Sequence, residues 1–369
     1  MASAGYLKIL GEAPPQFLHV GQCTPFAGAS GPVVVTKELT YVGLNLLTPK
    51  ELRARIQSIK KFVASVHAAG VEKVFPYICN QTIAGDPEKR LGFWDFYDHW
   101  NDYQEFGIPP KPLTDPLRWM QRDPAGHLHF NYAKAHERYV PQSRWAPCPN
   151  NEYWHGYLEF ITEQIAGCGY DGIFVDNNTL HCYCAYCQKA FQRYLLGRYQ
   201  RAGLRQVFGT DALEKLRLHS GADRVFWAKS QPDFGEFLLK HRQKGELEEE
   251  FHVGGLKTTE EINEIGDNYL QRQASEYIDH VQAKYPPKEL RRKFGTENLR
   301  QLGIDTPQQR RLWFETQRFW GWSIAENLLG IARAGEKHKA GFLVLPNWGA
   351  MGTLRDLEER RSMAKNVAE

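Results

Sequence analysis

The stretch Asp171–Phe191, "DGIFVDNNTLHCYCAYCQKAF", joins a short apolar run to a cluster of thiols. The run ends on an acid, Asp176, and Cys182, Cys184 and Cys187 follow with C-x-C-x-x-C spacing. A short apolar run between glycine and an acid is typical of a buried strand, and the residues after Cys184 have the apolar spacing of a helix. The stretch therefore predicts a strand, a loop and a helix, with the reactive side chains in the loop.

The same alternation of helix and strand recurs along the chain. Residues 48–70 predict a helix, because Thr48 suits the N-cap, Pro49 the first turn and Glu51 the third position of a capping box. Gly70 is expected to end this helix. The apolar segment 71–79 then predicts a strand.

Further strands are expected at 16–22, 171–176 and 341–347, the last two preceded by helices over 151–170 and 307–340. Alternating helices and apolar strands predict an α/β fold with a parallel sheet, either a barrel or an open doubly wound sheet. No glycine-rich phosphate loop follows any of these strands, which disfavours a dinucleotide-binding fold.

Two segments interrupt this pattern. Residues 80–147 form a long connection rich in aromatic side chains, which argue against disorder. Residues 201–305 are charged and predict a helical insertion. We therefore expect a barrel part over 1–200 that carries the long loop, the insertion over 201–305, and a continuation over 306–369 with a long helix, a fifth strand and a following helix.

Composition narrows the class of protein. The chain has 369 residues, a net charge of +3 and no concentrated basic stripe, so nucleic acid is not an expected partner. No segment approaches the roughly 20 apolar residues of a membrane span, and the N-terminus has no apolar core of a secretory signal. We expect a cytoplasmic protein. Its odd number of cysteines, seven, favours reduced thiols over a disulfide framework.

The three clustered cysteines predict a metal site. A tetrahedral structural Zn²⁺ takes four thiolate or imidazole ligands, so one more is needed. The candidates are Cys148, which precedes a predicted helix, and His181. The alternatives are buried thiols without a metal, or a redox site.

The motifs "RWAPCPNNEYW" and "GIFVDNNTLHCYCAYCQKAFQRYLLGRY" resemble the glycoside hydrolase family 42 β-galactosidases and their less characterised relatives. The resemblance extends over a little more than half of the chain, and the cysteine spacing is its specific part. It implies a (β/α)₈ TIM-type barrel with its active site at the carboxyl ends of the strands. It also implies a structural zinc on Cys148, Cys182, Cys184 and Cys187, and a carbohydrate substrate. It leaves open whether the protein forms a homo-oligomer.

The chain departs from that family at both catalytic positions. The family's acid/base glutamate corresponds to Asn178, and an amide cannot transfer a proton at neutral pH. The family's nucleophile lies on strand seven, for which this chain has no match after its fifth recognisable strand. Either the barrel is incomplete at the C-terminus, or its topology differs from this count.

Asp176 is the leading catalytic carboxylate, because it ends an apolar strand where barrel enzymes keep reactive groups. It resembles the aspartate nucleophile of the α-galactosidase-like barrels, which follows a similar strand. Asn177 and Asn178 would bind sugar hydroxyls. The simpler alternatives are that Asp176 holds a turn and that the two amides serve turn chemistry.

Further substrate-binding candidates lie on other segments. Asn347 and Trp348 end the last strand, and Trp94, Asp95 and His99 lie in the long aromatic loop. Trp faces suit sugar rings, and Asp95 or Asp98 could supply a second acid; the alternative is that these residues pack the loop and the strand end.

We therefore predict a β-galactosidase-like glycoside hydrolase that uses carboxylate chemistry. The main alternative is a non-catalytic carbohydrate-binding or scaffold protein on a partial barrel. A zinc-dependent hydrolase is a third option, which would need a water ligand on the metal.

Overall fold

The computed structural model describes residues 4–33, 46–124, 126–128, 130–132, 144–178, 180–220, 224–242, 267–301, 304 and 306–347. The chain divides into two compact units. The first consists of 1–120, 146–180 and 321–369, and the second of 121–145 and 181–320. The insertion expected over 201–305 falls within the second unit, and the aromatic connection over 80–147 contributes residues to both.

The first unit carries the parallel strands and the helices that connect them. Its elements are α1 (Ala4–Glu12), β1 (Phe17–His19), α2 (Pro49–Ala68), β2 (Lys73–Phe75), β3 (Tyr77–Cys79), β4 (Ile83–Asp86), β5 (Leu91–Gly92), α3 (Phe93–Asp98), η1 (Trp100–Phe106), η2 (Pro116–Trp119), α4 (Glu152–Ala166), β8 (Gly172–Asp176) and β9 (Leu343–Pro346). The long helix α12 (Pro307–Glu336) contributes its C-terminal part to this unit.

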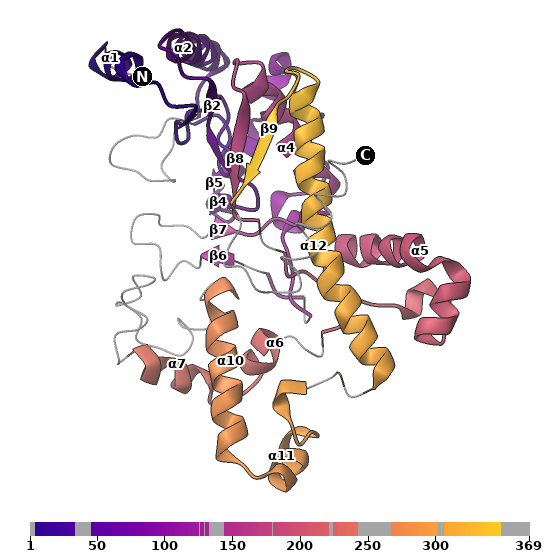
Figure 1. Ribbon diagram of the computed structural model, residues 1–369. Helices are drawn as coiled ribbons and strands as arrows, with labels where there is room; N and C mark the ends of the chain where they lie inside the picture. The colour runs from indigo at the N-terminus through magenta and orange to yellow at the C-terminus, as the bar shows by residue number, and fades with distance from the viewer. Residues whose placement is uncertain are drawn as a thin grey trace. The chain divides into compact units, whose positions relative to one another are not determined.

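The strands expected from the sequence pair in parallel, whereas β4 and β5 pair antiparallel. β1 pairs with β2, and β8 lies between β3 and β9. Figure 1 shows β8 and β9 side by side. The strand expected over 71–79 is divided into β2 and β3 at Pro76, which has no N–H to donate. Pairing continues across this break, because Val20 N–H donates to Phe75 and Tyr77 N–H donates to Gly21.

In chain order, the described parallel strands are therefore β1, then β2 and β3 as one interrupted strand, then β8, and then β9. The strand that ends at Asp176 is third in this series of described strands, and β9 is fourth, whereas the strand at 341–347 is expected to be the fifth. Closure into a (β/α)₈ barrel stays a prediction.

The two faces of these strands differ in burial. One face carries Val74, Ile78, Ile173 and Val175, each at most 1% exposed, and helices α2 and α4 lie against β2 and β8. The register places a second set of side chains on the other face: Phe17, His19, Phe75, Tyr77, Phe174, Asp176, Leu343 and Leu345. We call this the open face, because Phe17, Leu343 and Leu345 remain 58%, 39% and 38% exposed.

Helix α2 begins and ends as its sequence predicts. The Thr48 side chain accepts from the Glu51 N–H, and the Glu51 carboxylate accepts from the Thr48 N–H at 2.8 Å, which completes the capping box. The helix ends at Ala68, and Gly70 follows with a φ of 96°, in the left-handed region that favours glycine.

Aromatic side chains organise the part of the long connection that belongs to the first unit. Trp94, Trp100 and Trp119 are at most 1% exposed. The ring of Phe93 packs edge-on against Trp154 and Tyr157 of α4. This segment is therefore ordered by apolar burial, as its composition predicts.

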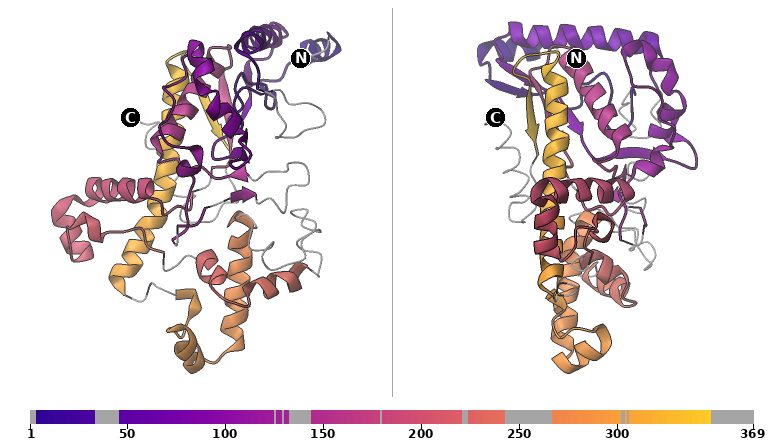
Figure 2. Two further views of the ribbon diagram at one scale, coloured as in Figure 1. Left: turned by 180° about the vertical axis from the view of Figure 1, so that it is seen from behind. Right: turned by 90° about the vertical axis from the view of Figure 1, so that its right-hand side faces the viewer.

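The described part of the second unit is mostly helical (Figure 2). Its elements are β6 (Phe130–Tyr132), β7 (Arg144–Trp145), α5 (Ala185–Phe208), η4 (Leu213–Lys215), α6 (Arg224–Lys229), α7 (Phe234–Arg242), α10 (Asp267–Lys284), α11 (Pro287–Phe294), η5 (Leu299–Gln301) and the first part of α12. A separate core joins α6, α7, α10 and α11 around the buried side chains of Phe234, Leu238 and Tyr277. Between 201 and 305 the described elements are all helical, as the sequence predicts, and the interpretation of this segment as an insertion stays a prediction.

Among the described residues, no helix has both the length and the apolar character that a bilayer-spanning segment needs.

The close approach of β8 and β9 generates a stability prediction. A Cβ built on Gly172 would lie 2.2 Å from the carbonyl oxygen of Leu343, a backbone atom that cannot move aside without breaking the pairing. We expect Gly172→Ala to lower the free energy of unfolding by about 3 kcal/mol, measured by urea denaturation. The control is Gly156→Ala on α4, where a Cβ meets nothing within 4 Å and helix propensity should raise stability by up to about 1 kcal/mol. Equal stabilities of the two variants would contradict this account.

Candidate metal centre and candidate active site

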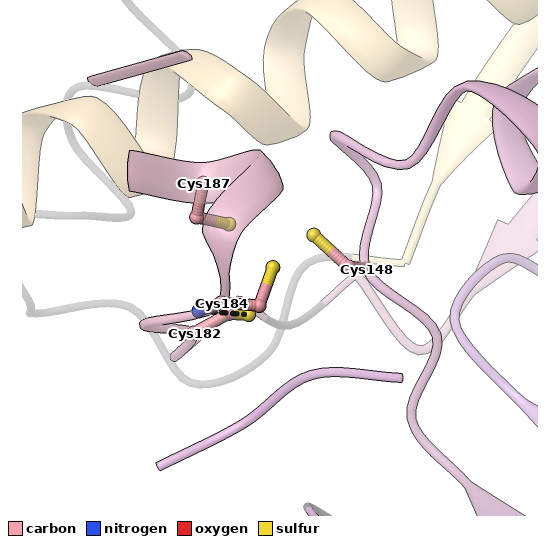
Figure 3. A group of neighbouring side chains, drawn as sticks. All are labelled: Cys148, Cys182, Cys184 and Cys187. Atoms are coloured by element: carbon pink, nitrogen blue, oxygen red, sulfur yellow. Dashed lines mark hydrogen bonds between the residues drawn. The ribbon is translucent and has the colours of Figure 1, made fainter. Parts of the chain in front are cut away.

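Four cysteines lie together in the structure. The sulfurs of Cys148, Cys182, Cys184 and Cys187 are all within 4.8 Å of one another, and each residue is at most 8% exposed (Figure 3). The grouping expected from the sequence is thus confirmed, with Cys148 as the fourth member. His181 is not part of the group; its ring packs edge-on against Trp320.

Local backbone structure positions each thiol. Cys148 lies in the turn before α4, where its N–H donates to Trp119 and its carbonyl accepts from Asn151, the N-cap of that helix. Cys184 is the N-cap of α5, and Cys187 lies in the first turn. A helix N-terminus favours a negative charge, so this position favours the thiolate forms that bind metals.

The sulfur of Cys182 accepts hydrogen bonds from two backbone N–H groups. The donors are Arg122 and Cys184, each 3.4 Å from the sulfur. Such donors neutralise part of the charge of a buried thiolate, whose burial without compensation would be costly.

The donor set fits a metal ion. Tetrahedral zinc with Zn–S bonds of about 2.3 Å separates its sulfurs by about 3.8 Å, which a small contraction of the observed cluster would reach. All seven cysteines are free thiols, so no disulfide competes for these sulfurs. Four buried sulfurs leave no ligand position for water. The cluster can therefore hold a metal ion in a closed site.

Asp176 lies at the carboxyl end of β8 and is half-buried. The Tyr77 hydroxyl donates to its Oδ2, and the Asn347 amide donates to its Oδ1 at 2.8 Å. Within the described ranges these are the hydrogen-bond partners of its carboxylate, and they come from the two neighbouring strand positions, β3 and β9. The backbone carbonyl of Asp176 accepts from the Asn80 N–H. Among the described residues, the carboxylate is thus held by side chains and accepts from no backbone N–H.

The Tyr77 hydroxyl is the donor in its hydrogen bond to Asp176. Burial raises the pKa of this phenol, and the nearby Cys79 and Asp176 raise it further, so that it stays protonated at neutral pH. The proton of this hydrogen bond therefore belongs to Tyr77, and Asp176 is the acceptor.

The amides of Asn177 and Asn178 make local contacts. Asn177 has a φ of 59° and donates to the Thr82 hydroxyl at 2.9 Å. Asn178 donates to the Val175 carbonyl and accepts from Asn80, both at 2.9 Å. These contacts fit the alternative of turn chemistry: the two side chains shape the loop after β8.

Trp94 has no face available to a sugar in this structure. It is fully buried, and its indole donates to Asp115 at 3.0 Å. This burial favours the alternative that Trp94 packs the loop. Trp348 lies outside the described residues.

Asp95 and His99 lie in and just after α3. The His99 ring nitrogen is 3.2 Å from the Asp95 carboxylate and 2.9 Å from its carbonyl oxygen, and the carbonyl contact raises the His99 pKa. Asp98 pairs with Arg90, which lowers the pKa of Asp98 and keeps it ionised, so it is a poor proton donor. The hydrogen bonds and ion pairs of Asp95 and His99 do not involve Asp176.

Sequence reasoning missed Tyr77 and His19. Tyr77 lies two residues before Cys79, the register partner of Asp176, on the same face of the sheet. Period-two alternation along 71–79 and 16–22 could have assigned both residues to a common face, but the alignment of the strands is needed to bring Tyr77 to Asp176 and His19 to Tyr77.

The packing role of Trp94 can be tested directly. We expect Trp94→Ala to lower the free energy of unfolding by about 3–5 kcal/mol, because it leaves a large cavity and removes one of the hydrogen bonds to Asp115, which keeps those from Arg90 and the Leu117 N–H. Leu113→Ala is the control, since Leu113 is 94% exposed and its removal should change stability by at most about 0.5 kcal/mol. A Trp94→Ala protein of normal stability with weakened sugar binding would instead support a binding role.

Comparison with known proteins adds no relative. No family model matches the chain, and no curated protein matches it. The metal cluster and the Asp176 site rest on the residues and their geometry, and the likeness to family 42 stays a prediction.

Proposed function

We propose that the chain is a glycosidase-like hydrolase of O-glycosidic bonds, with Asp176 as its catalytic carboxylate. The observation that carries this proposal is the arrangement at the end of β8, where two donors hold a half-buried carboxylate. In α/β proteins with parallel strands, ligands bind at the carboxyl ends of the strands, which is where Asp176 lies.

Asp176 is suited to act as a nucleophile. Tyr77 and Asn347 each donate to a different carboxylate oxygen, which orients the group and leaves lone pairs for reaction. Attack on the anomeric carbon would form a glycosyl ester and release the leaving-group oxygen, which needs a proton. Water would then cleave the ester.

A second carboxyl group must supply that proton, about 5–5.5 Å from the nucleophile in a retaining enzyme. The partners bonded to Asp176 in the described ranges are a phenol and an amide. We assign no residue to this role.

We further propose that the cysteine cluster holds a structural Zn²⁺. Soft thiolates select zinc among the common closed-shell ions, and a four-sulfur site is saturated. The ion would connect the turn before α4 to the loop before α5. A zinc-dependent hydrolase is disfavoured by the same donor set, since it leaves no position for water.

The alternative is a carbohydrate-binding protein without turnover. Asn178 favours it, because this residue occupies the position of the acid in the resembled family and its amide is engaged in the loop after β8. Binding of sugars without hydrolysis would distinguish this alternative.

The glycosidase proposal predicts the outcome of one substitution. We expect Asp176→Asn to reduce hydrolysis of a responsive aryl glycoside by at least about 1,000-fold, because an amide cannot form the glycosyl ester. The measurement is release of the aryl alcohol across a panel of aryl glycosides and oligosaccharides. Asp102→Asn, at an exposed position on η1, is the control and should keep wild-type turnover. Turnover by Asp176→Asn near the wild-type rate would remove Asp176 from the mechanism.

The zinc proposal predicts a metal content and a cost of metal removal. We expect about one zinc per chain by elemental analysis, and a chelator should lower the melting temperature. Cys182→Ser should lose the metal. Cys168→Ser is the matched control: Cys168 is also buried, and burial raises its pKa to about 11, so it should remain an inert thiol. A purified protein without metal, whose melting temperature does not change when the chelator is added, would contradict the proposal.

A further inference from the structure

Three rings share the open face with Asp176, and one of them, Tyr77, contacts its carboxylate. His19, the last residue of β1, packs edge-on against Phe174 and Tyr77, with ring centroids 5.3 Å and 6.2 Å apart. Tyr77 and Phe174 stack at 6.1 Å with an interplanar angle of 25°. We call His19, Tyr77 and Phe174 the ring cluster.

The ring cluster is continuous with the proposed catalytic group. Tyr77 donates its hydroxyl to Asp176, and Phe174 precedes Asp176 by two residues on the same strand. Since side chains two residues apart in a strand share a face, the rings and the carboxylate lie on one surface. The surface is built from three neighbouring strand positions, β1, β3 and β8.

His19 is placed to meet a ligand. It is exposed, although two aromatic rings fix its orientation. Within the described part of the chain its ring nitrogens make no hydrogen bond, whereas those of His67, His99 and His127 do. A ring that is held in place and has a free donor and acceptor is a suitable contact for a hydroxyl group.

We propose that His19 is a substrate-contacting residue that binds a sugar hydroxyl beside Asp176. The ligand class is a pyranoside, whose apolar C–H face would lie over the partly exposed rings of Tyr77 and Phe174. The negative π-faces of these rings attract the weakly positive C–H groups. The anomeric carbon would then face Asp176, and the ring cluster takes the place that the sequence suggested for Trp94.

A purely structural role for His19 makes a different prediction. An exposed side chain at the end of a strand contributes little to stability. If His19 has only a structural role, its removal should leave stability, binding and turnover nearly unchanged. A substrate contact, by contrast, should alter binding while leaving stability unchanged. This inference rests on the proposed function, because it assigns the substrate class of the same site.

The test uses the full chain in two backgrounds. In the Asp176→Asn protein, which we expect to bind without turnover, isothermal titration with the best glycoside of the panel should give a Kd about tenfold weaker after His19→Ala. In the active protein, His19→Ala should raise KM by a similar factor with a smaller change in kcat. His19→Gln should recover part of the binding, because its amide can also donate and accept. Phe174→Leu should weaken binding while it keeps the strand apolar.

His127→Ala is the control, since His127 is a histidine with a 79% exposed side chain and lies outside the ring cluster. His19→Ala should melt at the wild-type temperature. A wild-type Kd and KM for His19→Ala, together with loss of turnover in Asp176→Asn, would overturn this inference and leave the proposed function standing. A wild-type protein that neither binds nor cleaves any glycoside would overturn both.

Discussion

The pairing of β8 with strands on both of its sides is the constraint on which the rest of the first unit depends. β8 exchanges hydrogen bonds with β3 and β9, and Gly172 lets the β9 backbone approach closely. Just before the strand, the buried Asp171 accepts from the Val74 N–H at 2.8 Å and pairs with Lys339 at 2.8 Å. A slip of β8 by one residue would break these contacts and would turn Asp176 to the opposite face.

The candidate active site is a direct consequence of this register. Cys79 lies opposite Asp176, so Tyr77 reaches the carboxylate from one side, and the Asn347 N–H bonds to Val175, so the Asn347 amide reaches it from the other. The two faces of β8 differ in burial. Ile173 and Val175 supply apolar burial, while Phe174 and Asp176 lie on the open face, where we propose that a ligand binds.

The cysteine cluster represents another way to order a loop. Hydrogen bonds hold Asn177 and Asn178 after β8, whereas a metal would hold four sulfurs from two separate segments at one point. Because thiolates must lose protons and come together to bind, such a site couples metal binding to folding. The candidate metal site and the candidate catalytic carboxylate therefore follow the same strand, and we propose distinct roles for them.

The sequence by itself determined the features that depend on neighbours a few residues away. The capping box of Thr48 and Glu51, the apolar strand before Asp176 and the C-x-C-x-x-C spacing could be predicted because their interactions close within a turn or a strand. The tertiary structure decided the rest. It grouped Cys148 rather than His181 with the other cysteines, buried Trp94, and brought Tyr77 to Asp176 and His19 to Tyr77. The contacts of Tyr77 and His19 depend on the register between strands far apart in the chain. The burial of Trp94 and the position of Cys148 depend on packing between distant segments, and neither packing nor register leaves a pattern in any single segment.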